Sequence, residues 1–153
     1  MLGDVVEAAL AVGRVLVVTD DPAVVPRDAE VVMDPGGGLG AAVEAGLSQV
    51  EGHALVVNAD LPAATPASLR RLADSALALV EARDGTTNAL SLPDPHVFAP
   101  LYGPRSADRF RGHASFATAS IPELEDDVDS EADLERLGGR LGPRTRALLA
   151  VHA

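Results

Sequence analysis

Residues 54–62 read ALVVNADLP, an apolar run that passes directly into a polar turn containing Asp60. A short continuous apolar run bounded by turn residues is typical of a strand buried on both faces of a sheet. Thr65 and Pro66 follow as the predicted N-cap and first residue of a helix. Because strand, turn and helix repeat in this order in α/β proteins, the stretch predicts that fold class.

The same alternation extends through the rest of the chain. The predicted strands are residues 15–18, 31–33, 54–57 and 87–92, and the predicted helices are residues 2–12, 39–50, 66–83, 106–116, 131–137 and 141–151. Short loops between alternating strands and helices indicate a mostly parallel sheet with right-handed crossovers. At 153 residues we expect a single domain, residues 1–153.

Composition restricts the kind of core and the compartment. Hydrophobic residues make up 47% of the chain and aromatic residues only 3%, so Ala, Val and Leu must build the core. The absence of cysteine excludes disulfide bonds and thiolate metal sites. No apolar run reaches the roughly 18 residues that span a bilayer, and the acidic start at Asp4 and Glu7 is unlike a signal peptide. We therefore expect a cytoplasmic protein that does not bind membranes.

The charge pattern restricts the ligands. The formal net charge is -11, which argues against binding to nucleic acid, because phosphate contacts would meet net repulsion. All 12 basic residues are arginine, and lysine is absent. A P-loop lysine and a Schiff-base mechanism are therefore excluded for this sequence. Any anion site in it must use arginine, backbone N–H groups or a metal ion.

Asp60 follows the strand predicted at residues 54–57. In open α/β sheets, ligands bind beyond the carboxyl ends of strands, so this aspartate is a candidate site residue. The alternative is a turn aspartate that stabilises the loop before Thr65.

Asp127 and Asp129 form a second acidic candidate. If the segment is extended, its period of two points both carboxylates the same way, which suits Mg²⁺. The alternative is a solvated acidic loop that ends at the helix cap Ser130. Together with Asp60 these are three carboxylates without lysine partners, and they would repel one another unless a cation bridged them.

Three loops combine glycine with potential ligand donors. Residues 36–41 match G-x-G-x-x-A before a predicted helix, a weak dinucleotide-binding pattern for which a flexible turn is the alternative. The loops at residues 85–88 and 102–106 carry glycine and hydroxyl groups suited to a phosphate or carboxylate, with Arg105 and Arg109 nearby. Taken alone, loops of this kind are more often ordinary turns. The four histidines show no zinc spacing, and no G-x-S-x-G motif occurs.

Taken in order, six segments resemble the 2-phospho-L-lactate guanylyltransferase family. They are VLVVTDDP (15–22), GLGAA (38–42), ADLP (59–62), GTTNAL (85–90), YGPRS (102–106) and DVDSEADL (127–134). The actinobacterial branch of that family acts as a phosphoenolpyruvate guanylyltransferase in coenzyme F420 biosynthesis. The resemblance implies a Rossmann-like nucleotidyltransferase fold, a GT-A-like three-layer sandwich.

The resemblance also implies a reaction and its residues. GTP would donate GMP to phosphoenolpyruvate or 2-phospho-L-lactate, with Mg²⁺ assistance and release of pyrophosphate. By matching position, Asp60, Asp127 and Asp129 would hold the metal. The carboxylate and phosphate of the phospho-acid would be held by Thr87, Gly103 and Ser106.

The sequence departs from the family pattern in two places. Gly40 stands where the family usually has asparagine, which puts a nucleotide contact in doubt. The family's first strand and its basic, lysine-containing phosphate loop have no counterpart in this sequence, so we expect an N-terminally truncated fold. Two alternatives remain for this expectation: the natural protein is longer, or a short form binds GTP poorly. An uncovered sheet edge would favour pairing with a second chain as a homodimer.

Two other functions remain open beside guanylyl transfer. One is a catalytically inactive member that binds a phospho-acid or a partner chain. The other is a related nucleotidyltransferase with another substrate, such as a molybdenum-cofactor or sugar-phosphate enzyme.

Overall fold

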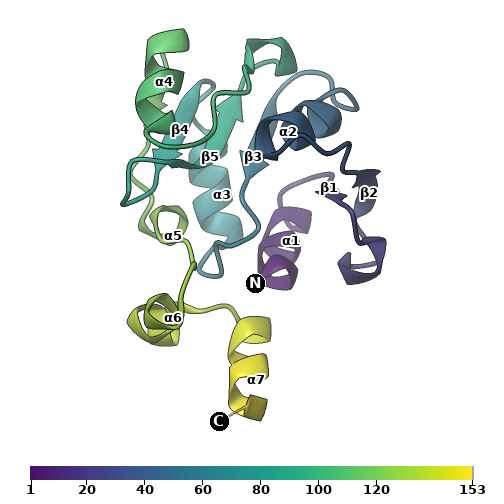
Figure 1. The fold of residues 1–153 in the computed structure, drawn as a ribbon, viewed down its shortest axis with the longest axis vertical. Coiled ribbons are helices and arrows are strands. Elements are labelled where there is room, and N and C mark those ends of the chain that lie inside the picture. Colours follow the sequence, from purple (N-terminus) through teal and green to yellow (C-terminus); the bar gives the residue numbers. More distant parts are fainter. Residues whose placement is uncertain (153) are drawn as a thin grey trace.

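A computed structural model describes residues 1–152 as alternating helices and strands (Figure 1). In chain order the elements are α1 (Leu2–Leu10), β1 (Leu16–Thr19), η1 (Pro22–Val24), β2 (Glu30–Met33), α2 (Leu39–Leu47), β3 (Ala54–Val57), α3 (Pro66–Ala73), β4 (Ala78–Glu81), β5 (Thr87–Leu92), η2 (Pro95–Val97), α4 (Ser106–His113), β6 (Ala117–Thr118), α5 (Pro122–Glu125), α6 (Glu131–Leu137), η3 (Gly138–Arg140) and α7 (Pro143–His152). The expected α/β class is confirmed.

The strands form two sheets. β1 and β2 pair in parallel, and the larger sheet has the order β3-β5-β4-β6. In the larger sheet β4 and β6 are parallel, whereas β5 runs antiparallel to both β3 and β4. The small sheet is parallel, and in the larger sheet β3, β4 and β6 run in one direction, as expected, whereas β5 alone is reversed. The reason is local: the turn from β4 to β5 is too short for the crossover that a parallel pair needs.

Helices cover both faces of the larger sheet, which gives the three layers that the resemblance implies. On one face, α1 and α3 pack against alternate residues of the strands, among them Leu55, Val57 and Val80. On the other face, α2 and α4 pack against Val56 and Leu90. The alternation of the two side-chain sets along each strand follows from the period of two in β structure.

One predicted helix is wrong in its second half. We expected a helix over residues 66–83, but α3 ends at Ala73 and residues 78–81 form the strand β4. The first three residues of β4 are completely buried, between α3 on one face of the sheet and α4 on the other. Burial in the sheet outweighs the helical propensity of alanine and leucine. The start of α3 is confirmed, because Thr65 and Ser68 form a capping box.

The strand expected at residues 15–18 is confirmed as β1, but it is not buried on both faces. Only Val17 is buried, and β2 exposes Val31 and Met33. Within residues 1–152, β1 pairs with β2 and with no other strand. Helix α2 packs closely against β1: a Cβ atom added at Gly46 would lie 3.0 Å from the side chain of Val18.

The C-terminal part of the chain extends away from the sheets, where α6 and α7 lie beyond α5 (Figure 1). Asp4 of α1 fixes the start of α7: its carboxylate accepts hydrogen bonds from the backbone N–H groups of Arg144 and Thr145, each at 2.9 Å. These are first-turn N–H groups that the helix itself cannot satisfy. The two ends of the chain are thereby held together.

Candidate active site

The carboxyl end of β3 meets the amino end of β5, because the two strands are antiparallel. The Asn58 N–H donates to the Asn88 carbonyl at 3.0 Å, and the Asn58 side-chain amide donates to the Thr87 carbonyl at 3.3 Å. These bonds continue the ladder past the end of β3. Asp60 therefore lies only two residues along the chain from Asn58, which is bonded to the segment that carries Thr87.

Asp60 is partly buried and incompletely paired. Its Oδ1 atom is shielded from solvent and has no hydrogen-bond partner among residues 1–152. Burial raises the pKa of the Asp60 carboxyl above its usual value, and the charge of Asp129 raises it further. A buried polar atom without a protein partner is uncommon in folded proteins, and such atoms bind water, an ion or a ligand.

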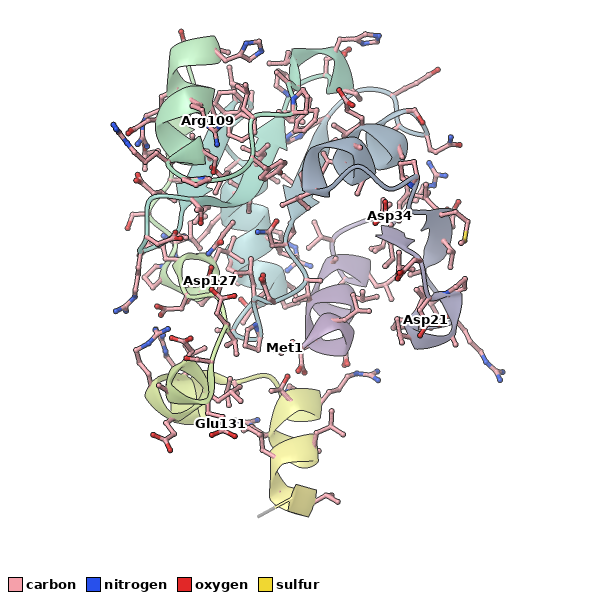
Figure 2. All side chains as sticks on the ribbon, in the orientation of Figure 1. Met1, Asp21, Asp34, Arg109, Asp127 and Glu131 are labelled. Atoms are coloured by element: carbon pink, nitrogen blue, oxygen red, sulfur yellow. The ribbon has the colours of Figure 1, made fainter. Side chains whose placement is uncertain are left out.

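The segment that carries Asp127 lies directly against the Asp60 loop, because the Val128 N–H donates to the Asp60 carbonyl at 3.1 Å. Figure 2 shows Asp127 on the connection from α5 to α6. Burial raises the pKa of Asp127, and the neighbouring charges of Asp129, Asp60 and Asp84 add to the shift. The structure thus brings the three expected carboxylates into one electrostatic group.

Burial alternates along this segment from Asp126 to Val128. Asp126 and Val128 are buried, whereas Asp127 is half-buried and Asp129 exposed. Asp126 has extended backbone angles, with φ −103° and ψ 97°. The alternation is that of an extended segment as far as Val128, and a bend begins at Asp129.

The arrangement is compatible with Mg²⁺ without being a finished cage. Within residues 1–152 no three Asp, Glu, His or Cys side chains are gathered closely enough to enclose an ion. Mg²⁺ usually takes only one or two protein carboxylates, and substrate phosphates and water complete its octahedron. The unpaired oxygen of Asp60 and the charge of Asp127 fit that pattern.

We expect Asp127→Asn to raise the melting temperature at pH 7 in the absence of divalent ions. The folded-state pKa of Asp127 is raised, so its contribution to stability is fully present below the unfolded-state pKa and is lost as pH rises through the folded-state pKa. The asparagine variant does not lose this stability, because an amide does not ionise. Melting curves from pH 3 to pH 8 check the expectation: the difference between variant and wild type should shrink toward acid. A difference that does not depend on pH would contradict it.

Thr87, Gly103 and Ser106 are brought together at the start of α4. The Ser106 hydroxyl donates to the Thr87 hydroxyl at 3.0 Å, and both side chains are buried. The Ser106 N–H donates to the Gly103 carbonyl at 3.0 Å. In a hydroxyl pair one group donates to the other, so one hydroxyl hydrogen of the pair can donate to another acceptor.

A β-bulge shapes this part of β5. Val80 pairs with Ala89, but the next pair is Glu81 with Thr87, so Asn88 is the extra residue. Bulges re-aim side chains and are frequent beside active sites. Here the bulge allows Thr87 to reach Ser106 while the Asn88 side chain reaches Leu124.

Left-handed backbone marks the loop at residues 102–106. Gly103 has φ +112°, and Arg105 is the one residue other than glycine with positive φ among residues 1–152, at 56°. Strain of this kind persists where the surroundings enforce it, often at ligand sites. The Ala107 N–H donates to the Gly85 carbonyl at 3.3 Å, so the two loops predicted from their glycine and hydroxyl residues are neighbours.

Arg105, the N-cap of α4, and Arg109 on α4 are engaged with the protein. Arg105 forms an ion pair with Asp108 at 2.9 Å, and Arg109 donates to the Tyr102 carbonyl at 2.9 Å. Figure 2 shows Arg109 on α4, the helix that the loop at residues 102–106 leads into. The bidentate ligand contacts expected for these arginines would require them to give up their present partners.

Three residues of this region received no individual role from the sequence, although Asn88 and Tyr102 lie in the two candidate loops. Asn88 is buried, donates to the Leu124 carbonyl at 3.1 Å and keeps an unpartnered Oδ1. Tyr102 has a buried hydroxyl without a partner among the described residues, and burial raises its pKa. Asp126 is buried among arginines. The position of Asn88 directly after Thr87 is a sequence signal that could have indicated a site residue. The arginine partners of Asp126 are too distant in sequence to be inferred.

The glycine-rich loop before α2 is confirmed in place, with Gly38 as the N-cap. Gly40, however, is enclosed: a Cβ there would lie 2.6 Å from the Cβ of Pro100 and 3.2 Å from its Cα. The position therefore admits no side chain while residues 99–101 keep their place. The family's asparagine cannot be accommodated here without movement of that loop.

We expect Gly40→Ala to lower the free energy of unfolding by about 1–3 kcal/mol, the usual cost of overpacking. Gly112→Ala is the matched control, because Gly112 lies in α4 with nothing within 4 Å of an added Cβ. That variant should gain up to ~1 kcal/mol, since alanine is the better helix former. Chemical denaturation of the two variants checks the difference, and equal stabilities would contradict the packing at Pro100.

The fold is that of a nucleotidyltransferase. Residues 1–124 match the family described as the MobA-like NTP transferase domain, and the chain belongs to this family. Phosphoenolpyruvate guanylyltransferase of Geodermatophilus obscurus is 40% identical over 172 aligned positions, which cover 100% of this chain and 78% of that protein. The enzyme of the same name from Streptomyces scabiei is 36% identical, over 94% of this chain and 76% of its own.

A solved structure agrees with these matches. A hypothetical transferase from Thermus thermophilus superposes with a TM-score of 0.64 at 26% identity, over 88% of this chain and 85% of that one. The family expected from the six sequence segments is thus confirmed. Among the described residues, no helix is long and apolar enough to cross a membrane.

Proposed function

We propose that the chain transfers GMP from GTP to phosphoenolpyruvate, or to the closely related 2-phospho-L-lactate. Relatives that align with nearly the whole chain carry the name phosphoenolpyruvate guanylyltransferase. The observation that carries the proposal is the junction of β3 and β5. There Asn58, two residues before Asp60, is hydrogen-bonded to the Thr87 carbonyl, and the Thr87 hydroxyl pairs with Ser106. The Oδ1 atom of Asp60 has no partner among the described residues, and the Asp60 carbonyl is bonded to the segment that carries Asp127.

The proposed reaction needs no protein nucleophile. A phosphate oxygen of the acceptor attacks the α-phosphorus of GTP, and the bond from the α-phosphorus to the bridging oxygen of the β-phosphate breaks. Pyrophosphate leaves with that electron pair, and the acceptor keeps the GMP group. Catalysis of this kind consists of positioning and charge stabilisation.

Each part of the site has one role in the proposal. Thr87 and Ser106 hold the phospho-acid through hydroxyl groups, and Gly103 does so through its backbone. Asp60, Asp127 and Asp129 bind Mg²⁺, which supplies the positive charge that the two anionic substrates need. The demand for a cation is strong because the chain itself carries a net charge of -11. We place the reaction in coenzyme F420 biosynthesis.

Product analysis of the full chain tests the proposal. The chain is incubated with GTP, MgCl₂ and either phosphoenolpyruvate or 2-phospho-L-lactate, and the products are identified by mass spectrometry. A guanylated phospho-acid is expected with one of the two acceptors. A rise in melting temperature with phosphoenolpyruvate but no product would instead support an inactive member that binds the phospho-acid. Products with a sugar phosphate alone would indicate a related nucleotidyltransferase.

A further inference from the structure

Asp126 is a buried carboxylate, 2% exposed, held by three arginines. Its Oδ1 accepts from Arg83 at 2.5 Å and from Arg136 at 2.6 Å, and its Oδ2 accepts from Arg140. A buried charge is tolerated where it is paired, and here the pairing is threefold. None of the site residues described above makes a comparable set of contacts.

The three arginines come from separate parts of the chain. Arg83 lies in the turn between β4 and β5, Arg136 on α6 and Arg140 in η3. One carboxylate therefore joins the turn between the two inner strands of the large sheet to the C-terminal helices, which Figure 1 shows lying away from the sheets. The segment that starts at Asp126 bridges the two parts.

The residues that follow Asp126 alternate between two environments. Val128 packs with the small apolar cluster of Leu134, Leu137 and Leu141. Its N–H donates to the Asp60 carbonyl at 3.1 Å. Asp127 is half-buried and Asp129 exposed, outside the arginine and leucine contacts of Asp126 and Val128. The charges of Asp60 and Asp129 both act on the Asp127 carboxyl, so the three carboxylates are near enough to interact.

We propose that Asp126 is a positioning residue: its three-arginine clamp fixes the segment so that Asp127 and Asp129 face Asp60 and can bind a divalent cation. The metal part of this inference rests on the proposed function; the positioning part does not. A residue behind the metal ligands commonly changes metal affinity by about 10- to 100-fold when it is replaced.

Two measurements on the full chain test the inference, with Mn²⁺ alone as the probe ion. Electron paramagnetic resonance gives the Mn²⁺ affinity, and amide hydrogen exchange gives the protection of the Val128 N–H. In Asp126→Asn the Mn²⁺ dissociation constant should rise about 10- to 100-fold. The Val128 amide should exchange faster while the Ala119 amide, which is bonded to the Leu79 carbonyl at 2.8 Å, keeps its rate.

Controls separate positioning from general stability. Glu30→Gln removes a carboxylate paired with Arg14 at 2.7 Å on β2, far along the chain, and should change neither measurement. Arg83→Gln and Arg140→Gln each remove one ion pair with Asp126. Because these arginine side chains are 66% and 48% exposed, both variants should fold, and they decide the question if Asp126→Asn does not fold. Both should shift the Val128 exchange in the same direction by a smaller factor.

Three outcomes would overturn the inference. They are unchanged exchange at Val128, equal acceleration at Val128 and Ala119, and wild-type Mn²⁺ affinity in a variant whose Val128 amide has lost protection. If the wild-type chain binds no Mn²⁺, the metal role in the proposed function fails. The exchange at Val128 then decides the positioning role by itself.

Discussion

Replacing Asp60 with asparagine is expected to lower pyrophosphate release from GTP and phosphoenolpyruvate by roughly a thousandfold. The carboxylate combines a buried oxygen that has no partner in the described chain with a raised pKa, and the change removes its charge while keeping its shape. Charge stabilisation by a bound metal is worth several kcal/mol, and each 1.36 kcal/mol is a factor of ten in rate. Initial rates at saturating substrate and MgCl₂ measure the loss.

The control for Asp60 is a carboxylate of the same type outside the site. Asp28 is exposed in the turn before β2, and Asp28→Asn should keep the wild-type rate. The melting temperature of Asp60→Asn should not fall, because the variant removes a charge that the fold disfavours. Full activity in Asp60→Asn would show that the metal role assigned to this residue is wrong.

Ser106→Ala is expected to raise the KM for phosphoenolpyruvate by about 10- to 100-fold with little change in the KM for GTP. A hydrogen bond to a charged group contributes about 1.5–3 kcal/mol, and each 1.4 kcal/mol is a factor of ten in affinity. The variant also removes the donor to Thr87, so both hydroxyls of the proposed phospho-acid site are affected. Steady-state kinetics with each substrate varied in turn measure the two constants.

Ser120→Ala serves as the matched control for Ser106. The Ser120 hydroxyl donates to Glu125 at 2.8 Å on an exposed part of the chain, and its loss should leave both KM values unchanged. Equal increases of the two KM values in Ser106→Ala would contradict a site specific for the phospho-acid. They would indicate a general disturbance of α4 instead.

The sequence around Asp60 was informative because local and tertiary requirements agree there. An apolar run, a polar turn and a Thr-Pro helix start each follow from short-range chemistry, and β3 and α3 begin where these signals place them. The alternation of burial from Asp126 to Val128 was equally local. The ordered segments then joined distant parts of the chain into one family pattern, which the comparisons confirm.

Other features depend on contacts that no local pattern contains. Residues 78–81 read as a continuation of a helix, and only their burial between α3 and α4 makes them a strand. The direction of β5 follows from the short turn after β4. The arginine partners of Asp126 lie 10 to 43 residues away, so its role could not be predicted from its neighbours.

The most direct test of the central claim is pyrophosphate release by the full chain with GTP, phosphoenolpyruvate and MgCl₂. Circular dichroism and melting curves first establish that the chain is folded. Release that requires all three components, and that falls to background in Asp60→Asn, is the result predicted for guanylyl transfer at this site. If the folded wild-type chain released pyrophosphate only at the background rate with phosphoenolpyruvate and also with 2-phospho-L-lactate, the claim would be contradicted.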